Sequence, residues 1–338
     1  MADAADGTWT VDRLMDEARG FRVPMLIAAL VKCGALDRLA AGAAEAPALA
    51  AACRVDGPAL ARMLDACASL GIAVKQGRRY ALAPSLAGDL AGGGVGTGLD
   101  GIRHTAQTLD KWKAIDEVLR QGRADYPPTM DVTADPALNE AFIRAMHAYA
   151  GPRARRLAEV LPREGARTLL DLGGGPGTFS LALLAAWPGL EATVADLPLT
   201  LRTTRKVIEE TGAGDRLRVL EADFYRDRSC LLGGPWDLAL VSAVLHAEGE
   251  AENRDLLRRV RGAVAPGGRI VIRENLLRED RVGPPLASLF DVHMLVSTRR
   301  GRCYTLGEIS SMLAEAGFPD PRLLTDIEEG FVVARAEC

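Results

Sequence analysis

The chain has 338 residues, which is long enough for two domains or one large one. Its 41 basic and 45 acidic side chains give a formal charge of −4, so there is no general electrostatic attraction for nucleic acid or an anionic membrane. Apolar residues make up 48% of the chain, but the longest apolar stretch near the N-terminus, residues 23–31, is far shorter than the roughly 20 residues that span a bilayer.

The N-terminal residues and the cysteines indicate the compartment. The first twelve residues, MADAADGTWTVD, are acidic where a secretory signal would be basic and then apolar. The six cysteines are scattered without a regular spacing, which is typical of reduced thiols. We therefore expect a soluble cytoplasmic protein.

Residues 1–100 are predicted to form a mainly helical, winged-helix-like domain. Ala and Leu recur with helical spacing from Val11 to about residue 85, and AVKQGRRYALAP forms a hairpin-like piece at residues 73–84. A winged helix can bind DNA, but residues 1–95 carry ten basic and ten acidic side chains, so no basic face is expected. We therefore favour a dimerisation or packing domain over a DNA reader.

Residues 101–154 are predicted to form a helical bridge. The glycine-rich residues 92–101 and the segment ADYPPTMD, residues 124–131, interrupt the helical pattern. Helices are expected over residues 106–119 and 139–160.

From residue 155 to the C-terminus, the pattern predicts a doubly wound, Rossmann-like α/β domain. Short apolar runs alternate with helical stretches that begin near Thr178, Leu199, Glu250 and Leu306, which favours a parallel sheet covered on both faces. The runs are TLLDL, ATVAD, LRVLEAD, WDLALVSAVL and GRIVIREN. RLLTDI and FVVARA then predict a terminal hairpin.

The strongest motif is a glycine loop that follows the predicted strand over residues 168–172. Gly173, Gly175 and Gly177 allow a tight turn and the close approach of a ligand, so a nucleotide is expected. The dinucleotide fingerprint would require Gly or Ala at position 178, which is Thr178, and the Gly-Lys-Ser/Thr ending of a phosphate-binding loop is missing.

Two acids follow the next two predicted strands. Asp196 can accept hydrogen bonds from ribose hydroxyls. Asp223 and its neighbour Phe224 offer an acceptor and an aromatic face suited to adenine. Each acid alone is more often a cap or turn residue, but their order after the glycine loop favours a nucleotide site.

Seven motifs together resemble one known family. They are DLGGGPG (171–177), ADLP (195–198), EADFY (221–225), VLHAE (244–248), APGGRIVIREN (265–275), DVHML (291–295) and LAEAGF (313–318). The chain resembles, over nearly its whole length, the class I S-adenosylmethionine-dependent methyltransferases (EC 2.1.1), specifically the two-domain small-molecule O-methyltransferases of the caffeate and hydroxyindole type.

The resemblance implies S-adenosylmethionine as cofactor and a homodimer interlocked through the N-terminal domains. The glycine loop would pass the methionine end of the cofactor, Asp196 would hold the ribose, and Asp223 with Phe224 would flank adenine. Asp171 and Leu197 belong to the same motifs and are also expected to bind the cofactor.

The resemblance also implies a catalytic base, although the surrounding pattern departs from the family. His246 matches the family's base, and Glu274 matches an acid that orients it. The family pattern His-Asp-Trp is His-Ala-Glu here, at residues 246–248, and a second acid is missing from GRCYT, residues 301–305.

A histidine at position 293 suggests a different chemistry. His246, His293 and Asp291 could hold a metal ion, iron or zinc, with positions open for substrate. Such a metal would stabilise the enolate of a 2-oxo acid, so we favour metal-assisted C-methylation of its β-carbon, similar to a branch of the superfamily that serves antibiotic biosynthesis. The alternative is metal-free O-methylation of a phenolic hydroxyl with His246 as general base.

Further residues are expected at the acceptor site. Met146, Arg144 and Met294 are expected to contact the substrate, and Arg103 or Arg144 to pair with a substrate carboxylate. A DNA-binding regulator that uses the cofactor domain as a sensor, and a protein that binds the cofactor for another reaction, remain alternatives.

Overall fold

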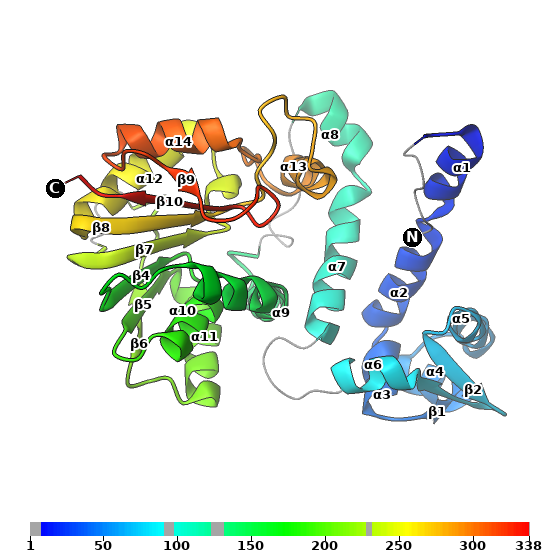
Figure 1. The fold of residues 1–338 in the computed structure, drawn as a ribbon. Helices are drawn as coiled ribbons and strands as arrows, with labels where there is room; N and C mark the ends of the chain where they lie inside the picture. The colour runs from blue at the N-terminus through cyan, green and yellow to red at the C-terminus, as the bar shows by residue number, and fades with distance from the viewer. Residues whose placement is uncertain (1–7, 91–97, 123–131, 228–231, 338) are drawn as a thin grey trace. The chain divides into compact units, whose positions relative to one another are not determined.

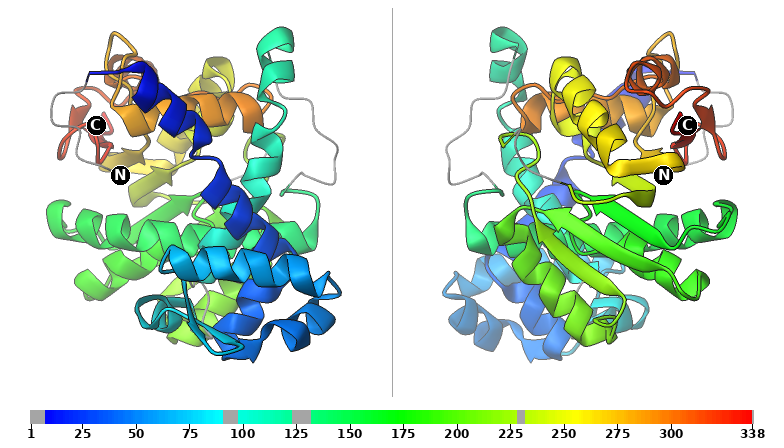
Figure 2. Two further views of the ribbon diagram at one scale, coloured as in Figure 1. Left: turned by 90° about the vertical axis from the view of Figure 1, so that its right-hand side faces the viewer. Right: turned by 90° about the vertical axis from the view of Figure 1, so that its left-hand side faces the viewer.

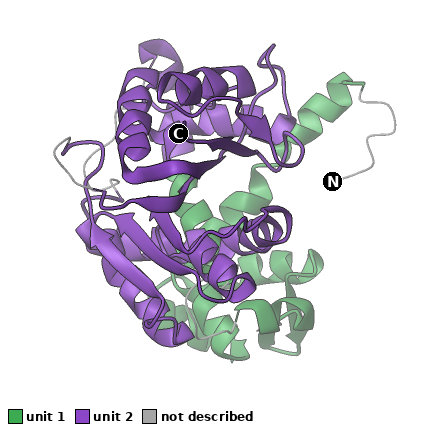
Figure 3. Cartoon of the chain, turned by 60° about the vertical axis from the view of Figure 1, so that its left-hand side comes forward, with its two compact units in different colours: residues 1–93, 97–110 green, residues 94–96, 111–338 purple. Residues whose placement is uncertain are grey.

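The structure is a computed structural model that describes residues 8–90, 98–122, 132–227 and 232–337. The chain forms two compact units, residues 1–93 with 97–110 and residues 94–96 with 111–338 (Figure 3). The three-part division made from the sequence stays a prediction. The expected interruption at residues 124–131 lies outside the described residues.

The first unit is mainly helical and carries a small antiparallel sheet in the order β1-β3-β2. Its helices are α1 (Val11–Arg19), α2 (Arg22–Lys32), α3 (Ala35–Ala41), α4 (Ala46–Cys53), α5 (Gly57–Ser69), α6 (Pro84–Leu90) and most of α7 (Gly98–Trp112). Its strands are β1 (Ala44–Glu45), β2 (Ala73–Gln76) and β3 (Arg79–Leu82). Strands β2 and β3 are the hairpin predicted from AVKQGRRYALAP.

Two boundaries differ from the sequence prediction. Helix α7 already begins at Gly98, inside the expected interruption at 92–101, because Leu99 and Ala106 are buried along it and outweigh the helix penalty of about 1 kcal/mol for a glycine. The helix expected over 106–119 ends at Trp112, and α8 (Ile115–Gln121) follows as a separate element.

Helix α9 (Pro136–Val160) belongs to the second unit and agrees with the helix expected at residues 139–160. The side chain of Asp135 accepts a hydrogen bond from the backbone N–H of Leu138, and Pro136 occupies the first turn, where its missing N–H is not needed.

The second unit contains a seven-stranded sheet in the order β6-β5-β4-β7-β8-β10-β9 (Figure 1). In that order the strands are Leu217–Glu221, Glu191–Asp196, Thr168–Leu172, Trp236–Ser242, Val264–Arg273, Phe331–Arg335 and Arg322–Leu323. The first five are parallel to their neighbours, while β10 is antiparallel to β8 and β9. The predicted Rossmann-like domain is therefore confirmed, and β9 and β10 form the predicted terminal hairpin.

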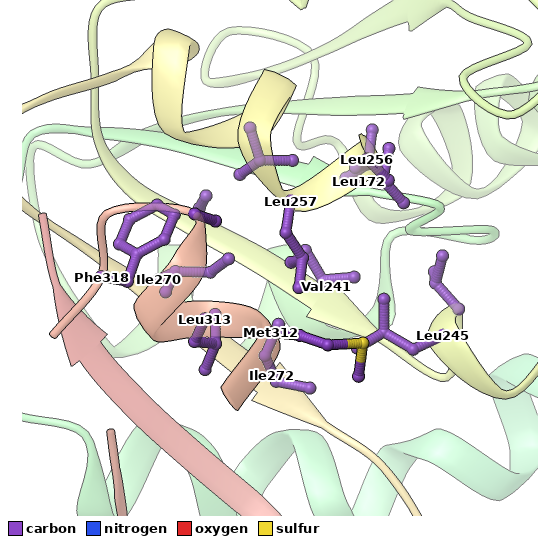
Figure 4. Close-up of a cluster of buried hydrophobic side chains, with 14 of the residues drawn as sticks. Leu172, Val241, Leu245, Leu256, Leu257, Ile270, Ile272, Met312, Leu313 and Phe318 are labelled. Carbon is purple, nitrogen blue, oxygen red and sulfur yellow. The ribbon is translucent and has the colours of Figure 1, made fainter. Parts of the chain in front are cut away.

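Helices cover both faces of this sheet (Figures 1 and 2). They are α9, α10 (Thr178–Ala186) and α11 (Pro198–Thr211) on one face, and α12 (Glu250–Ala263) and α14 (Leu306–Glu315) on the other. Alternate strand residues serve the two layers: Leu169 packs toward α9 to α11, and Leu170 toward α12 and α14. Figure 4 shows part of the hydrophobic cluster on the side of α12 and α14, where Leu257 and Met312 pack near Val241.

No helix within the described ranges combines the length and the hydropathy that crossing a bilayer requires.

Among the described residues, Cys33, Cys53, Cys67 and Cys303 are free thiols.

Gly330 provides a test of how β10 is joined to β8. Its φ is +70°, and a Cβ there would lie 1.8 Å from the carbonyl oxygen of Glu274. Gly330→Ala is expected to lower the free energy of unfolding by about 2 kcal/mol or more, since the left-handed conformation alone costs about 1–2 kcal/mol. Chemical denaturation measures the loss.

Gly262 is the matched control. It lies in α12, and a Cβ at this position would meet no other described atom within 4 Å, so Gly262→Ala should raise stability by about 0.5–1 kcal/mol. Equal effects of the two alanines would contradict the packing described for Gly330.

Candidate active site

The candidate site lies where the strand order reverses. Strand β4 lies between β5 and β7, so the loops that follow these three strands meet at the carboxyl edge of the sheet. Ligands of open α/β sheets bind at such a switch point. The glycine loop, Asp196 and the turn that carries His246 all follow these strands.

The glycine loop is closely packed against two other segments. Gly173 has φ +67°, and a Cβ there would lie 2.5 Å from Val244 Cγ2 and 3.3 Å from Phe224 Cζ. Gly175 and Gly177 also have positive φ values of +53° and +75°. The loop therefore requires glycine for its conformation and, at Gly173, for space.

Asp196 closes the glycine loop from the end of β5. Its carboxylate accepts hydrogen bonds from the backbone N–H of Gly175 at 2.8 Å and of Leu197 at 2.7 Å. Burial raises the pKa of Asp196 to about 6, against the lowering effect of these N–H groups. Each carboxylate oxygen has a second lone pair, so the residue can still accept a hydroxyl hydrogen bond.

Asp171 lies fully buried beneath the loop. One of its oxygens accepts a hydrogen bond from the hydroxyl of Ser180 at 2.7 Å, and the other has no hydrogen-bond partner among the described residues. Burial raises the pKa of Asp171 to about 6. A buried oxygen without a partner is costly, which indicates that a further donor is expected at this point.

Asp223 and Phe224 follow β6 near the same loop. The carboxylate of Asp223 accepts a hydrogen bond from the backbone N–H of Arg226 at 3.1 Å and so also caps a turn. The Phe224 ring is buried and faces Gly173, whose missing Cβ would lie in contact with the ring edge. The structure thus brings the predicted cofactor residues together at one edge of the sheet.

Sequence reasoning missed two side chains that support the glycine loop. His147 Nδ1 lies 2.7 Å from the hydroxyl of Thr178, and burial lowers the pKa of His147. The hydroxyl of Thr204 donates to the carbonyl of Gly175 at 2.6 Å. Both residues lie on helices remote from the loop in sequence, and only the helical spacing of Ile143 and His147 hinted that this face of α9 is turned inward.

His246 and Glu274 form a direct pair. His246 belongs to a short 3₁₀ turn, η2 (Leu245–Ala247), after β7, and Glu274 directly follows β8. His246 Nδ1 lies 2.6 Å from Glu274 Oε2. The other oxygen, Oε1, accepts the backbone N–H groups of Val244 and Leu245 at 2.9 and 2.8 Å.

The electrostatics of this pair define its protonation. Burial acts to raise the pKa of Glu274, but His246, Arg273 and the backbone N–H of Leu245 outweigh it, and the net pKa is lowered. Glu274 is therefore ionised at neutral pH and can only accept hydrogen bonds. His246 then carries its proton on Nδ1, which leaves the lone pair on Nε2 to act as a base.

The predicted metal site is not formed. Among the described residues, no group of three or more His, Cys, Asp or Glu side chains is arranged to hold a metal ion. Asp291 instead accepts the backbone N–H of Cys303 at 2.6 Å and lies 3.7 Å from Arg281. A carboxylate engaged in this way does not complete a site with His246 and His293.

His293 has its own polar partners. Its Nδ1 accepts the indole N–H of Trp112 at 3.1 Å and lies 3.2 Å from the hydroxyl of Ser297. The ring of Phe290 has both His246 and His293 as ring neighbours, with centroid distances of 5.0 and 5.6 Å. The two imidazoles thus share one aromatic neighbour but differ in the partner of Nδ1. The Nδ1 of His246 faces the Glu274 carboxylate, whereas the Nδ1 of His293 accepts the indole N–H of Trp112.

The residues expected to contact substrate have different surroundings. Met294 is buried on α13 (Pro285–Ser297), and Met146 is half-buried on α9. Arg144 pairs with Glu140 at 3.0 Å. In the first unit, Arg103 pairs with Asp37 and, at 2.9 Å, with Asp100. Both candidate arginines therefore already have carboxylate partners.

Comparisons with known proteins agree with this arrangement. Residues 112–319 match the family model of an O-methyltransferase domain, and residues 15–85 match that of an O-methyltransferase dimerisation domain. The resemblance inferred from the sequence motifs is therefore confirmed.

Individual relatives extend the comparison. The chain is 31% identical over 320 residues to 3-hydroxy-5-methyl-1-naphthoate 3-O-methyltransferase of Streptomyces sahachiroi, covering 91% of this chain and 90% of that one. It is 31% identical over 185 residues to L-tyrosine C(3)-methyltransferase of Streptomyces lavendulae, covering 54% and 50%. Human N-acetylserotonin methyltransferase in complex with SAM superposes with a TM-score of 0.82 at 25% identity, covering 100% of both chains.

Glu274→Gln tests the buried pair through the pH dependence of stability. An amide cannot accept all the hydrogen bonds of the carboxylate, so the free energy of unfolding should fall by about 2–3 kcal/mol at pH 7. The lowered pKa of Glu274 means that its contribution is complete above the unfolded value of about 4.3 and is lost as the pH falls through the folded value. Wild type and variant should therefore converge in acid, measured by denaturation from pH 7 to pH 3.

Glu315→Gln is the control for this titration. Its pKa is also lowered, chiefly by a hydrogen bond from Arg254, but the pair is exposed to solvent and contributes little. A difference at Glu274 no larger than at Glu315 would contradict a structural role for the buried carboxylate.

Proposed function

Since the chain belongs to the S-adenosylmethionine-dependent O-methyltransferases with an N-terminal dimerisation domain, we propose that it methylates a hydroxyl group of a small aromatic metabolite with His246 as general base. The observation that carries this proposal is the 2.6 Å contact between His246 Nδ1 and the ionised carboxylate of Glu274. The contact directs the proton to Nδ1 and leaves Nε2 as the base.

The residues of the cofactor edge fit S-adenosylmethionine. The buried Asp171 oxygen, which has no hydrogen-bond partner among the described residues, suits a bound ligand that donates a hydrogen bond. We assign the ribose hydroxyls to Asp196, the adenine to Asp223 and Phe224, and the methionine end to the glycine loop. Leu197 supplies a backbone N–H that holds Asp196 in place.

When bound, S-adenosylmethionine supplies an electrophilic methyl group. The protein must then hold the acceptor oxygen in line with that methyl group and remove its proton. His246 Nε2 would take the proton that the hydroxyl loses when its oxygen gains the methyl group and the sulfonium loses it, and the resulting imidazolium would be stabilised by the adjacent Glu274 carboxylate.

The acceptor class follows from the relatives and the local residues. The naphthoate relative acts on a hydroxylated aromatic ring, and Phe290 places an aromatic surface beside His246 in this chain. A phenolic hydroxyl is the acceptor that this combination suits. A homodimer, supported by the dimerisation-domain match, and a cytoplasmic location complete the proposal.

Metal-assisted C-methylation of a 2-oxo acid is the second candidate. It is favoured by His293, which has Phe290 as a ring neighbour in common with His246, and by the relative that methylates a carbon of L-tyrosine. Asp291 is engaged elsewhere and does not serve as a third ligand, so any metal would depend on the two imidazoles and the substrate.

Alanine substitutions of the two histidines separate these candidates. His246→Ala should lower kcat by about 10²–10⁴-fold toward a phenol panel, because it removes the general base. His293→Ala, the same change at the other histidine that neighbours Phe290, should alter KM for the acceptor while kcat remains within a few-fold. Steady-state kinetics with and without a chelator measure both effects.

The opposite pattern would support the second candidate. Loss of activity in both variants and with the chelator, together with turnover of aryl or alkyl pyruvates, would overturn the general-base proposal.

Asp196→Asn tests the cofactor assignment. Replacing one carboxylate oxygen by an NH₂ group removes acceptor capacity at the ribose, so the Kd for S-adenosylmethionine should rise about tenfold or more. Isothermal titration measures the affinity.

Asp237→Asn is the matched control, because Asp237 also accepts two backbone N–H groups but lies at the opposite end of the sheet. Equal affinities in the two variants would contradict the ribose assignment.

A further inference from the structure

We propose that a hydrogen-bonded triad, Tyr225–Asn253–Tyr304, positions the turn that carries His246 and couples it to the Asp223–Phe224 segment. The inference rests on the proposed function, since it assigns the triad to the general base and the cofactor edge. The three residues come from the loop after β6, from α12 and from the segment before α14.

The turn that carries His246 needs partners from outside itself. Within the 3₁₀ turn over residues 245–247, the N–H of Glu248 reaches the Leu245 carbonyl only at 3.4 Å, and the His246 carbonyl accepts the N–H of Arg302 at 3.0 Å. The side-chain NH₂ of Asn253 donates to the carbonyl of Leu245 at 2.8 Å. The hydroxyl of Tyr304 donates to the carbonyl of Glu248 at 2.8 Å. The residues on either side of His246 and Ala247 are thus both fixed by the triad.

The shortest hydrogen bonds of the triad define one arrangement of donors and acceptors. The Tyr225 hydroxyl also lies 3.3 Å from the Val244 carbonyl, and the Asn253 NH₂ 3.4 Å from that of Glu248. Because Tyr304 uses its only proton on Glu248, its oxygen accepts the second N–H of Asn253, at 2.9 Å. The amide oxygen of Asn253 therefore faces Tyr225, whose hydroxyl donates to it at 2.6 Å. Asn253 and Tyr304 are almost completely buried, where each of these bonds is strong and a missing one is costly.

The other end of the triad reaches the cofactor edge. Tyr225 directly follows Phe224, and the two rings have a centroid distance of 5.3 Å. Phe224 in turn lies beside Gly173 of the glycine loop. A displacement of Phe224 by bound cofactor is thereby passed to Asn253 and to the carbonyl beside His246.

The triad also explains how the turn tolerates its unusual sequence. The chain has Ala247 and Glu248 where the pattern of the family that it resembles has Asp and Trp. Asn253 and Tyr304 bind the main-chain carbonyls of Leu245 and Glu248, so their hold on the turn does not depend on the side chains of Ala247 and Glu248.

Histidine NMR of the full-length protein tests the positioning role without any acceptor. With four histidines in the chain, ¹⁵N-labelled imidazole signals can be assigned with the help of His246→Ala. In the wild type, His246 should be a single Nδ1–H tautomer. Asn253→Leu, which keeps the branched shape but no hydrogen bond, should give a mixture of tautomers. Tyr225→Phe and Tyr304→Phe keep the ring and provide the same test if Asn253→Leu does not fold.

Tyr80→Phe is the matched control. Tyr80 is also a buried tyrosine whose hydroxyl donates to a side chain, Asp65, at 2.7 Å, but it lies in the first unit. Its loss should leave the His246 signals unchanged. Unchanged His246 signals in all three triad variants would overturn the proposal.

Cofactor coupling and kinetics complete the test. S-adenosylhomocysteine should shift the His246 signals of the wild type, and Tyr225→Phe should reduce that shift by at least half. Asn253→Leu should lower kcat about 10–100-fold with little change in KM, as for a misplaced catalytic group. A shift that is the same in Tyr225→Phe and wild type would remove the coupling from the proposal. Full turnover by His246→Ala would refute the proposed base instead, while the NMR result would still decide the positioning.

Discussion

The candidate site depends on one buried carboxylate, that of Glu274. A charged group this deep in the protein is stable only when its charge and lone pairs are satisfied. Glu274 meets this condition with His246 on one oxygen and the N–H groups of Val244 and Leu245 on the other. The end of β7, the end of β8 and the turn that carries His246 are therefore held by a single side chain, and Gly330 of the β10 hairpin closes over the Glu274 carbonyl.

The cofactor edge is built on the same principle at the end of β5. Asp196 accepts two backbone N–H groups and so fixes the glycine loop against the neighbouring strand. Burial raises the pKa of Asp196 and of Asp171 to about 6, whereas that of Glu274 is lowered, because only Glu274 faces an imidazole and an arginine. The carboxylates of the candidate site therefore have pKa values that are shifted in opposite directions.

Sequence reasoning identified the residues whose roles follow from their place at strand ends. The glycine loop, Asp196, His246 and Glu274 all follow parallel strands, and the switch-point rule brings such residues together. Contacts between distant segments were not accessible in this way. Trp112 and His293 are 181 positions apart, and nothing in either segment indicates that an indole N–H meets that imidazole. The same limit applies to the predicted metal ligands: DVHML shows that Asp291 is near His293, but not that Asp291 accepts the backbone N–H of Cys303.

The acidity of the acceptor favours a hydroxyl group over a carbon, because an imidazole can assist the loss of a phenolic proton more readily than that of a proton on carbon. An ordinary phenol has a pKa of about 10 and an imidazole about 6.5, a difference of about 5 kcal/mol for complete proton transfer. Charge stabilisation of the imidazolium by a buried, ionised Glu274 can offset part of this, and proton removal need only keep pace with formation of the oxygen–carbon bond. The β-carbon of a 2-oxo acid is far less acidic, so the same base would need a Lewis acid to assist it. The described residues orient the His246 ring through Glu274, and this arrangement suits the proposed oxygen acceptor.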